Sequence, residues 1–398
     1  MDYPIDCPDL TVSQPANDYP LEGEDRSPIA RIAFHPLAKC LAMTRAGGDV
    51  EIRPLPFATT RKVRRDLRTI LFMQFFFFSF HFLCLIRLAQ LTIIIIFIYA
   101  DNALKKKCLP LQVPPLVISS TSPSNATSSP PKLSFCHSGT KNLIAYKGAI
   151  YNAERTAKTS ALSSLLPLVN LANDANHASF FYCDKFLVHG NGNSIVLSQY
   201  DTTRGASRTV WSHSIEGSLR ITDLACLNAP RSHLVFVSNS DRSMRVLDVA
   251  IGSEYWSVPN ASGRRQAHSI ALPPASPNSP VPPDAYNLVG AASHDQGGLI
   301  TLWDVRTASP AATLTGHTNR RDLCRINFSP CMRYLSTGTE DATGGAIYDL
   351  RKGEIKGRIA EGRKLKDGTV TEVAWNPIFP QLATATNEGV VRFYSAGE

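Results

Sequence analysis

A short pattern that recurs roughly every 45 residues most constrains the fold of this chain. Each copy is a residue pair at the end of an apolar run, and the second residue is acidic in most copies. The copies are Tyr151-Asn152, Tyr200-Asp201, Leu247-Asp248, Trp303-Asp304, Tyr348-Asp349 and Phe393-Tyr394. Successive copies lie 45 to 49 residues apart, except for one step of 56 residues that contains a Pro-rich stretch at 272–283. A fixed period of this length indicates a repeat architecture.

Within one repeat, short apolar strands alternate with turn residues. In the clearest copy a strand at 325–328 is followed by a Ser-Pro turn, a second strand at 334–338 and a third strand at 346–349. The next copy has the same order and places Asn376-Pro377 in the turn, where no backbone N–H is needed for a ladder. Consecutive short strands at this period predict the antiparallel blades of a β-propeller.

The number of repeats predicts the size of the ring. Weaker copies at 29–53, 133–153 and 180–201 bring the count to seven units. We therefore predict an all-β, seven-bladed propeller, because a closed ring exposes no long sheet edge. The predicted boundaries are an N-terminal tail at 1–28, blade one at 29–56, an apolar and Pro/Ser-rich insertion at 57–132, and blades two to seven at 133–398.

The last third of the chain resembles the WD-repeat family. The resemblance rests on Gly316-His317, on Trp303-Asp304 and on the Ser-Pro and Asn-Pro turns, and it is strongest over 284–398. More narrowly, the C-terminal repeats are similar to those of the WD repeat-containing protein 27 group. The resemblance implies a hydrogen-bonded structural tetrad of His317, Thr337, Asp341 and Tyr348, with tyrosine in place of the usual tryptophan. Such a tetrad satisfies buried polar groups and braces a blade.

One segment, 69–100, does not fit a propeller blade. It contains two uncharged apolar runs on either side of Arg87, with basic residues on both flanks. Its length permits a membrane-spanning helix, but a charge in the middle of a span is costly. Three interpretations stay open: translation of an unspliced intron, a membrane anchor, or a disordered or buried insertion. The apolar runs favour a helix, and the Pro/Ser/Thr-rich stretch at 109–132 favours a disordered linker.

The charge of the chain argues against a nucleic-acid partner. The net charge is +8, but residues 61–107 alone hold nine basic and two acidic residues, so the rest of the chain is nearly neutral. No run of Lys and Arg interleaved with aromatic residues could follow a phosphate backbone. We therefore expect other proteins or protein complexes as partners.

No residue pattern indicates catalysis, a cofactor or a metal site. The nine cysteines form no C-x-x-C pair, and the ten histidines show neither H-E-x-x-H nor zinc-ligand spacing. Scattered cysteines favour free thiols and an intracellular protein, either cytoplasmic or nuclear. The predicted function is a non-catalytic scaffold for protein–protein interactions without a small-molecule substrate. The alternative is a membrane-tethered propeller scaffold anchored by residues 69–100.

Overall fold

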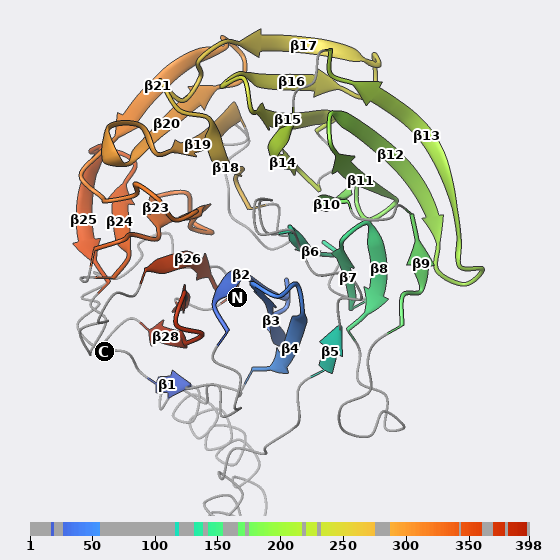
Figure 1. The fold of residues 1–398 in the computed structure, drawn as a ribbon, viewed down its shortest axis with the longest axis horizontal. Coiled ribbons are helices and arrows are strands. Elements are labelled where there is room, and N and C mark those ends of the chain that lie inside the picture. Colours follow the sequence, from blue (N-terminus) through green and yellow to red (C-terminus); the bar gives the residue numbers. More distant parts are fainter. Residues whose placement is uncertain are drawn as a thin grey trace, which may run out of the picture. The chain divides into compact units, whose positions relative to one another are not determined.

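The structure is a computed structural model that describes residues 17–19, 27–55, 116–118, 131–137, 142–153, 166–171, 175–216, 220–228, 232–274, 287–341, 344–359, 369–378 and 381–395. These residues form seven four-stranded antiparallel sheets (Figure 1). Each sheet is one blade, and the first strand of each blade lies nearest the axis of the ring. The prediction of an all-β, seven-bladed propeller is confirmed.

Each blade takes its four strands from a nearly continuous part of the chain. Blade one contains β2 (Ile29–Phe34), β3 (Cys40–Arg45), β4 (Val50–Pro54) and β5 (Leu116–Ile118), and blade two contains β6 (Leu133–Phe135), β7 (Leu143–Tyr146), β8 (Ala149–Asn152) and β9 (Val169–Asn170). Blade three contains β10 (His177–Phe181), β11 (Phe186–Asn191), β12 (Ser194–Asp201) and β13 (Ala206–Ser214), and blade four contains β14 (Ile221–Cys226), β15 (Leu234–Asn239), β16 (Met244–Asp248) and β17 (Ser253–Val258). Blade five contains β18 (Ala267–Ala271), β19 (Leu288–Ser293), β20 (Leu299–Asp304) and β21 (Ser309–Leu314), and blade six contains β22 (Ile326–Phe328), β23 (Tyr334–Thr337), β24 (Ala346–Asp349) and β25 (Glu354–Arg358). Blade seven contains β26 (Val370–Trp375), β27 (Gln381–Thr386), β28 (Val391–Ser395) and β1 (Asn17–Tyr19).

Blade seven is completed by the N-terminal part of the chain. Strand β1 pairs antiparallel with β28, so that Asn17 lies opposite Phe393 and Tyr19 lies opposite Val391. The sequence analysis assigned these residues to a tail, because the tripeptide Asn-Asp-Tyr shows no alternation of apolar and polar residues. The pairing joins the two ends of the chain in one sheet and covers an edge that would otherwise be open to another strand.

Blade one also differs from the prediction in its fourth strand. Strand β5 pairs with β4, and Val50 lies opposite Ile118. The segment between these two strands therefore interrupts a hairpin inside blade one, whereas the sequence analysis placed an insertion at 57–132 between blades one and two. A strand of three residues, Leu116–Ile118, is too short to show a periodic pattern of its own.

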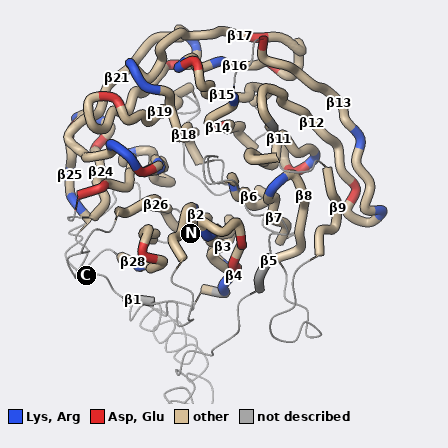
Figure 2. Tube along the Cα trace, in the orientation of Figure 1, with Lys and Arg blue, Asp and Glu red and all other residues tan. Residues whose placement is uncertain are grey.

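Burial decreases from the axis of the ring to its circumference. All five residues of β10 are buried, whereas β13 in the same blade is mostly exposed. Charged residues of both signs are scattered over the outer strands and turns (Figure 2). The apolar core lies in layers between adjacent blades, as where Tyr334 and Ile347 of blade six meet Val373 and Trp375 of blade seven. Each such buried side chain contributes on the order of 1.5–3 kcal/mol.

The aspartate of the sequence repeat closes the hairpin between the third and fourth strands. In four blades its carboxylate accepts a hydrogen bond from the backbone N–H two residues further on. These bonds run from Thr203 to Asp201 (2.9 Å), from Ala250 to Asp248 (2.8 Å), from Arg306 to Asp304 (2.9 Å) and from Arg351 to Asp349 (2.9 Å). An Asx turn of this kind replaces a backbone turn, so the repeat in the sequence marks a local turn requirement.

The apolar segment 69–100 lies outside the described residues. The short 3-10 helix η3 lies at Asp295–Gly297. A search of the described residues finds no helix that is long and apolar enough to span a membrane.

Candidate partner-binding site at the propeller axis

Equivalent polar residues of the seven first strands meet around the axis. In four of these strands the pairing register shifts at the same place, immediately before Arg31, Asp223, Ser269 and Glu372. The equivalent side chains in the other three blades are Lys132, His177 and Arg325, and all three reach the carboxylate of Asp223. Three of the seven bond the neighbouring blade: Glu372 accepts from the N–H of Ile32, Asp223 from Ile270 and Ser269 from Ile326. These axial residues therefore fix their own blades against the next.

Asp223 is the centre of this axial network. Its side chain is 1% exposed and accepts hydrogen bonds from the N–H groups of Ile270 (2.7 Å) and Leu224 (2.9 Å). Four basic side chains reach its carboxylate at 3.6 to 3.9 Å, namely Arg31, Lys132, His177 and Arg325. Burial alone would raise the pKa of Asp223, but Lys132, His177, Arg31 and Arg325 outweigh it and hold the pKa well below its usual value. Asp223 is therefore ionised at neutral pH.

Glu372 is the second buried carboxylate at the axis. It accepts a hydrogen bond from the N–H of Ile32 (2.7 Å) and another from the side-chain amide of Asn327 (3.3 Å). Burial raises the pKa of Glu372, and the charges of Arg31 and Arg325 only partly offset this effect. Two carboxylates in one network thus have pKa values that move in opposite directions.

Three cations accompany these two carboxylates. Burial lowers the pKa of Arg325 to about 10 and also lowers the pKa of Lys132. The Lys132 ammonium donates a hydrogen bond to the carbonyl oxygen of Leu224, and the Arg325 guanidinium donates to that of His268. With Arg31, the cations exceed the carboxylates by one positive charge.

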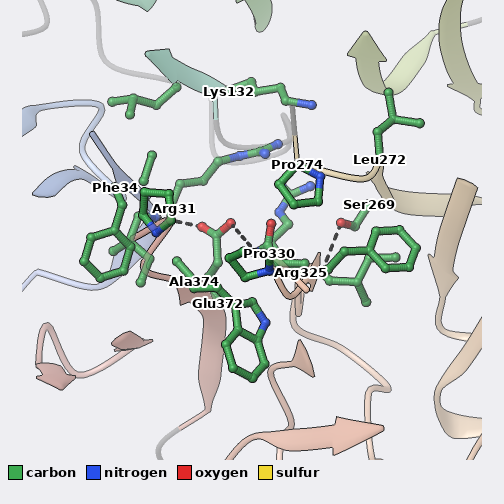
Figure 3. Close-up of a pocket in the computed structure, with 18 of the residues that line it drawn as sticks. Arg31, Phe34, Lys132, Ser269, Leu272, Pro274, Arg325, Pro330, Glu372 and Ala374 are labelled. Atoms are coloured by element: carbon green, nitrogen blue, oxygen red, sulfur yellow. Dashed lines mark hydrogen bonds between the residues drawn. The ribbon is translucent and has the colours of Figure 1, made fainter. Parts of the chain in front are cut away.

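The axial network forms the floor of a concave site, which we call the axial hollow (Figure 3). The hollow opens on the face formed by the turns between first and second strands. Its first part has a volume of about 340 Å³, and an adjoining part of about 280 Å³ shares Pro36, Lys132, Ile270, Leu272 and Asn327 with it. Its rim is apolar and includes Phe34, Leu272, Pro274, Pro330, Trp375 and Pro377. Concave sites with an apolar wall and a few buried polar groups are typical of ligand and peptide recognition.

Hydrogen bonds between blades support the rim of the hollow. The Asp184 carboxylate in the first turn of blade three accepts from the N–H of His137 (2.6 Å) and from the amide of Asn228, and both of these partners line the hollow. Three consecutive residues of this turn, Tyr182, Cys183 and Asp184, have left-handed φ angles of 50°, 55° and 61°. Backbone strain of this kind persists only where the surroundings enforce it, so the rim is rigid on this side.

The sequence analysis did not identify the axial network. A signal was present, because three first strands carry one charged residue between apolar ones: Ile29-Ala30-Arg31-Ile32, Ile221-Thr222-Asp223-Leu224 and Val370-Thr371-Glu372-Val373. The charges differ in sign, and lysine, histidine, serine and arginine occupy the equivalent position in the other four blades. The residue types therefore show no repeat, although the position at the axis recurs in every blade.

Comparison with known proteins agrees with the ring of blades. The family model described as "WD domain, G-beta repeat" matches residues 308–343. The crystal structure of the WD40 β-propeller domain of Doa1 aligns with a TM-score of 0.60 and 13% identity over 97% of each chain. The chain is a seven-bladed β-propeller with a WD40 repeat at 308–343. A stretch of 175 residues is also 27% identical to protein transport protein sec31 of Emericella nidulans, covering 43% of this chain and 12% of that protein.

The WD40 match covers three of the four residues that the resemblance assigned to a structural tetrad, namely His317, Thr337 and Asp341. The structure brings two of the four together: Nδ1 of His317 lies 2.8 Å from the hydroxyl of Tyr348. Thr337 donates to the carbonyl of Gly338, and Asp341 accepts from Arg358 at 3.3 Å. Within the described part of the chain, no hydrogen bond joins Thr337 or Asp341 to the other two, so the full tetrad stays a prediction.

Proposed function

We propose that this WD40 propeller is a non-catalytic scaffold that binds other proteins at the axial hollow. The observation that carries the proposal is the combination of an apolar rim with buried charges on the floor, both held by bonds between blades. Rigid apolar groups around polar anchors favour tight protein recognition, because little conformational freedom is lost on binding. WD40 propellers in general serve as platforms for protein interactions.

A search of the described residues finds no group of three or more His, Cys, Asp or Glu side chains that could hold a metal ion. Burial raises the pKa of the thiol of Cys226, which lines the hollow, to about 11, so this thiol stays protonated at neutral pH. A protonated thiol is a poor nucleophile.

A capture experiment with matched variants tests the docking site. Leu272→Glu places a charge on the rim of the hollow, and Ile251→Glu makes the same change on a 74% exposed side chain in a turn of blade four. We expect the full-length wild type and Ile251→Glu to retain the same crosslinked protein partners from native cells. Leu272→Glu should lose them. Equal recovery by all three proteins would exclude the hollow as the docking site.

A membrane-tethered scaffold is a second proposal, and it rests on the uncharged runs in segment 69–100. It predicts that the expressed protein resists extraction by alkaline carbonate. Release into the soluble fraction would contradict a tether and would leave an unspliced intron, or a disordered or buried insertion, as the origin of the segment. An intracellular location, cytoplasmic or nuclear, is part of the first proposal, and transcript sequencing tests the intron directly.

The narrower likeness of the C-terminal repeats to the WD repeat-containing protein 27 group also stays a proposal. The similarity to protein transport protein sec31 covers 12% of that protein, so it names no partner for this chain. We propose neither a nucleic acid nor a small-molecule substrate as a partner.

A further inference from the structure

We propose that the axial hollow binds the carboxylate side chain of one acidic residue in a linear segment of the partner, with apolar partner residues packed on the surrounding rim. The inference rests on the proposed docking function and adds the chemistry of the occupant. Its basis is the charge and shape of the hollow.

The charge of the axial network matches a single negative charge. By formal charge, Arg31, Lys132 and Arg325 contribute three positive charges, and Asp223 and Glu372 contribute two negative ones. One monoanion would neutralise the remaining charge, whereas a dianion such as a phosphate monoester would leave a surplus of negative charge beside Glu372. The charges therefore favour a carboxylate over a phosphate.

Lys132 is the cation best placed to meet an incoming carboxylate. Its side chain is 17% exposed, whereas the side chains of Arg31 and Arg325 are 8% and 1% exposed. Lys132 also lines both parts of the hollow. The ammonium can therefore donate to the ligand, while Arg31 and Arg325 contribute to the electric field from below. A bond between two charged groups in a partly desolvated site is stronger than the same bond in water.

The shape of the rim favours a segment that crosses the hollow over a chain end that enters it. Apolar groups surround the opening from several blades, including Phe34 of blade one, Leu272 of blade five, Pro330 of blade six and Trp375 of blade seven. A crossing segment can place apolar residues on both sides of its acidic residue. A C-terminal carboxylate would bring such residues to one side only.

A peptide display experiment with the full-length chain tests the inference. The probe is a library of random twelve-residue segments, each closed at its C-terminus by fusion to the carrier. We expect enriched peptides to share one Asp or Glu next to aromatic, leucine or proline residues. One enriched sequence is then synthesised with blocked ends in three forms, with Glu, Gln or phosphoserine at the shared position. A fourth form has Gln there and a free C-terminus.

The affinities of these four peptides decide the chemistry. The Glu peptide should bind roughly tenfold or more tightly than the Gln peptide, as expected for a charge-assisted contact. It should also bind more tightly than the phosphoserine and free-terminus forms. Tighter binding of the phosphoserine form, or binding of the free-terminus form alone, would overturn the proposal. A library that yields no enriched peptide, or only peptides without an acid, would also count against it.

Matched variants connect the preference to the hollow. Lys132→Met should abolish the preference for Glu over Gln, and Lys185→Met should leave it unchanged, since Lys185 lies in a turn on the same face but does not line the hollow. If Lys132→Met does not fold, the pair Leu272→Lys and Leu272→Glu replaces it. The lysine variant should bind the Glu peptide several-fold more tightly and the glutamate variant more weakly.

The scaffold proposal and the carboxylate inference can fail separately. If Leu272→Glu loses the native partner but wild type shows no preference for Glu over Gln, the scaffold proposal stands and the carboxylate inference is wrong. If the acidic peptides bind as expected but native partners are captured equally by all variants, the hollow recognises acids and the partner docks elsewhere.

Discussion

Asp223 at the axis and Asp304 on the circumference accept the same kind of hydrogen bond in opposite surroundings. Each carboxylate accepts from a backbone N–H, at 2.9 Å from Leu224 and at 2.9 Å from Arg306. Each has a lowered pKa, but the causes differ. At Asp304 the side chain and backbone of Arg306 lower the pKa at a surface site, whereas at Asp223 several cations must first overcome burial.

The difference separates two roles of charge in one propeller. On the circumference a carboxylate stabilises its own hairpin. Water can replace it as hydrogen-bond acceptor with a small loss of free energy. At the axis a carboxylate neutralises side chains from several blades, so removing it leaves buried cations without compensation. The axial charges therefore affect both the stability of the ring and the electric field inside the hollow. The turn aspartates do not link these two properties.

Replacement of Asp223 should have the largest effect. Asp223→Asn leaves Arg31, Lys132 and Arg325 around a neutral side chain, and we expect a loss of about 3–5 kcal/mol of unfolding free energy. Urea denaturation measures the loss. Asp304→Asn, which makes the same chemical change in an exposed turn, serves as the control and should unfold like the wild type. Similar urea midpoints for both variants would show that the axial network does not stabilise the ring.

The pH dependence of stability should reflect the axis as well. Burial lowers the pKa of His268 to about 3, so it stays neutral in the folded state while the unfolded chain takes up a proton near pH 6.5. Its stabilising contribution is complete above pH 6.5 and decreases as the pH falls below that value, by about 2 kcal/mol at pH 5. Asp223, with its lowered pKa, adds a further loss only below about pH 4.

His268→Gln should remove that part of the pH dependence. The variant is compared with His213→Gln in the outer strand β13, and both are unfolded in urea at pH 7 and pH 5. The difference in stability between the two pH values should shrink by about 2 kcal/mol for His268→Gln and stay unchanged for His213→Gln. An unchanged difference for His268→Gln would mean that other groups cause the acid sensitivity.

Turn aspartates on the circumference should differ among themselves according to burial. The Asp248 carboxylate is 5% exposed, accepts from the N–H groups of Ala250 (2.8 Å) and Ile251 (3.1 Å), and lies 3.2 Å from His233. We expect Asp248→Ala to cost about 1–2 kcal/mol, because two backbone N–H groups lose an acceptor that is itself buried. Asp304→Ala should shift the thermal midpoint less. A larger shift for Asp304→Ala would contradict a burial-dependent effect.

The same contrast explains what the sequence could predict. Turn aspartates recur in the chain because each hairpin needs its own, so Asp201, Asp248, Asp304 and Asp349 show the period and the blades. The axial residues are complementary across blades, with Arg31, Asp223 and Glu372 at equivalent positions, so no single residue type repeats. Strands β1 and β5 are three residues long and pair with distant parts of the chain, which a local pattern cannot reveal.

Replacement of Glu372 should have the smallest effect on stability and can have the opposite sign from that of Asp223. Glu372→Gln keeps an acceptor for the N–H of Ile32 and removes a charge whose pKa is raised by burial. The raised pKa means that ionised Glu372 lowers folded-state stability at neutral pH, and this penalty disappears as the pH falls toward the unfolded value near 4.3. We therefore expect a change within about 1 kcal/mol at pH 7, with any gain fading toward pH 4.5 in urea unfolding. The same variant increases the positive surplus of the hollow, so it should bind the Glu peptide several-fold more tightly than the wild type. A loss of several kcal/mol would show that Glu372, like Asp223, is a required counter-ion and that the axis has no positive surplus for a ligand.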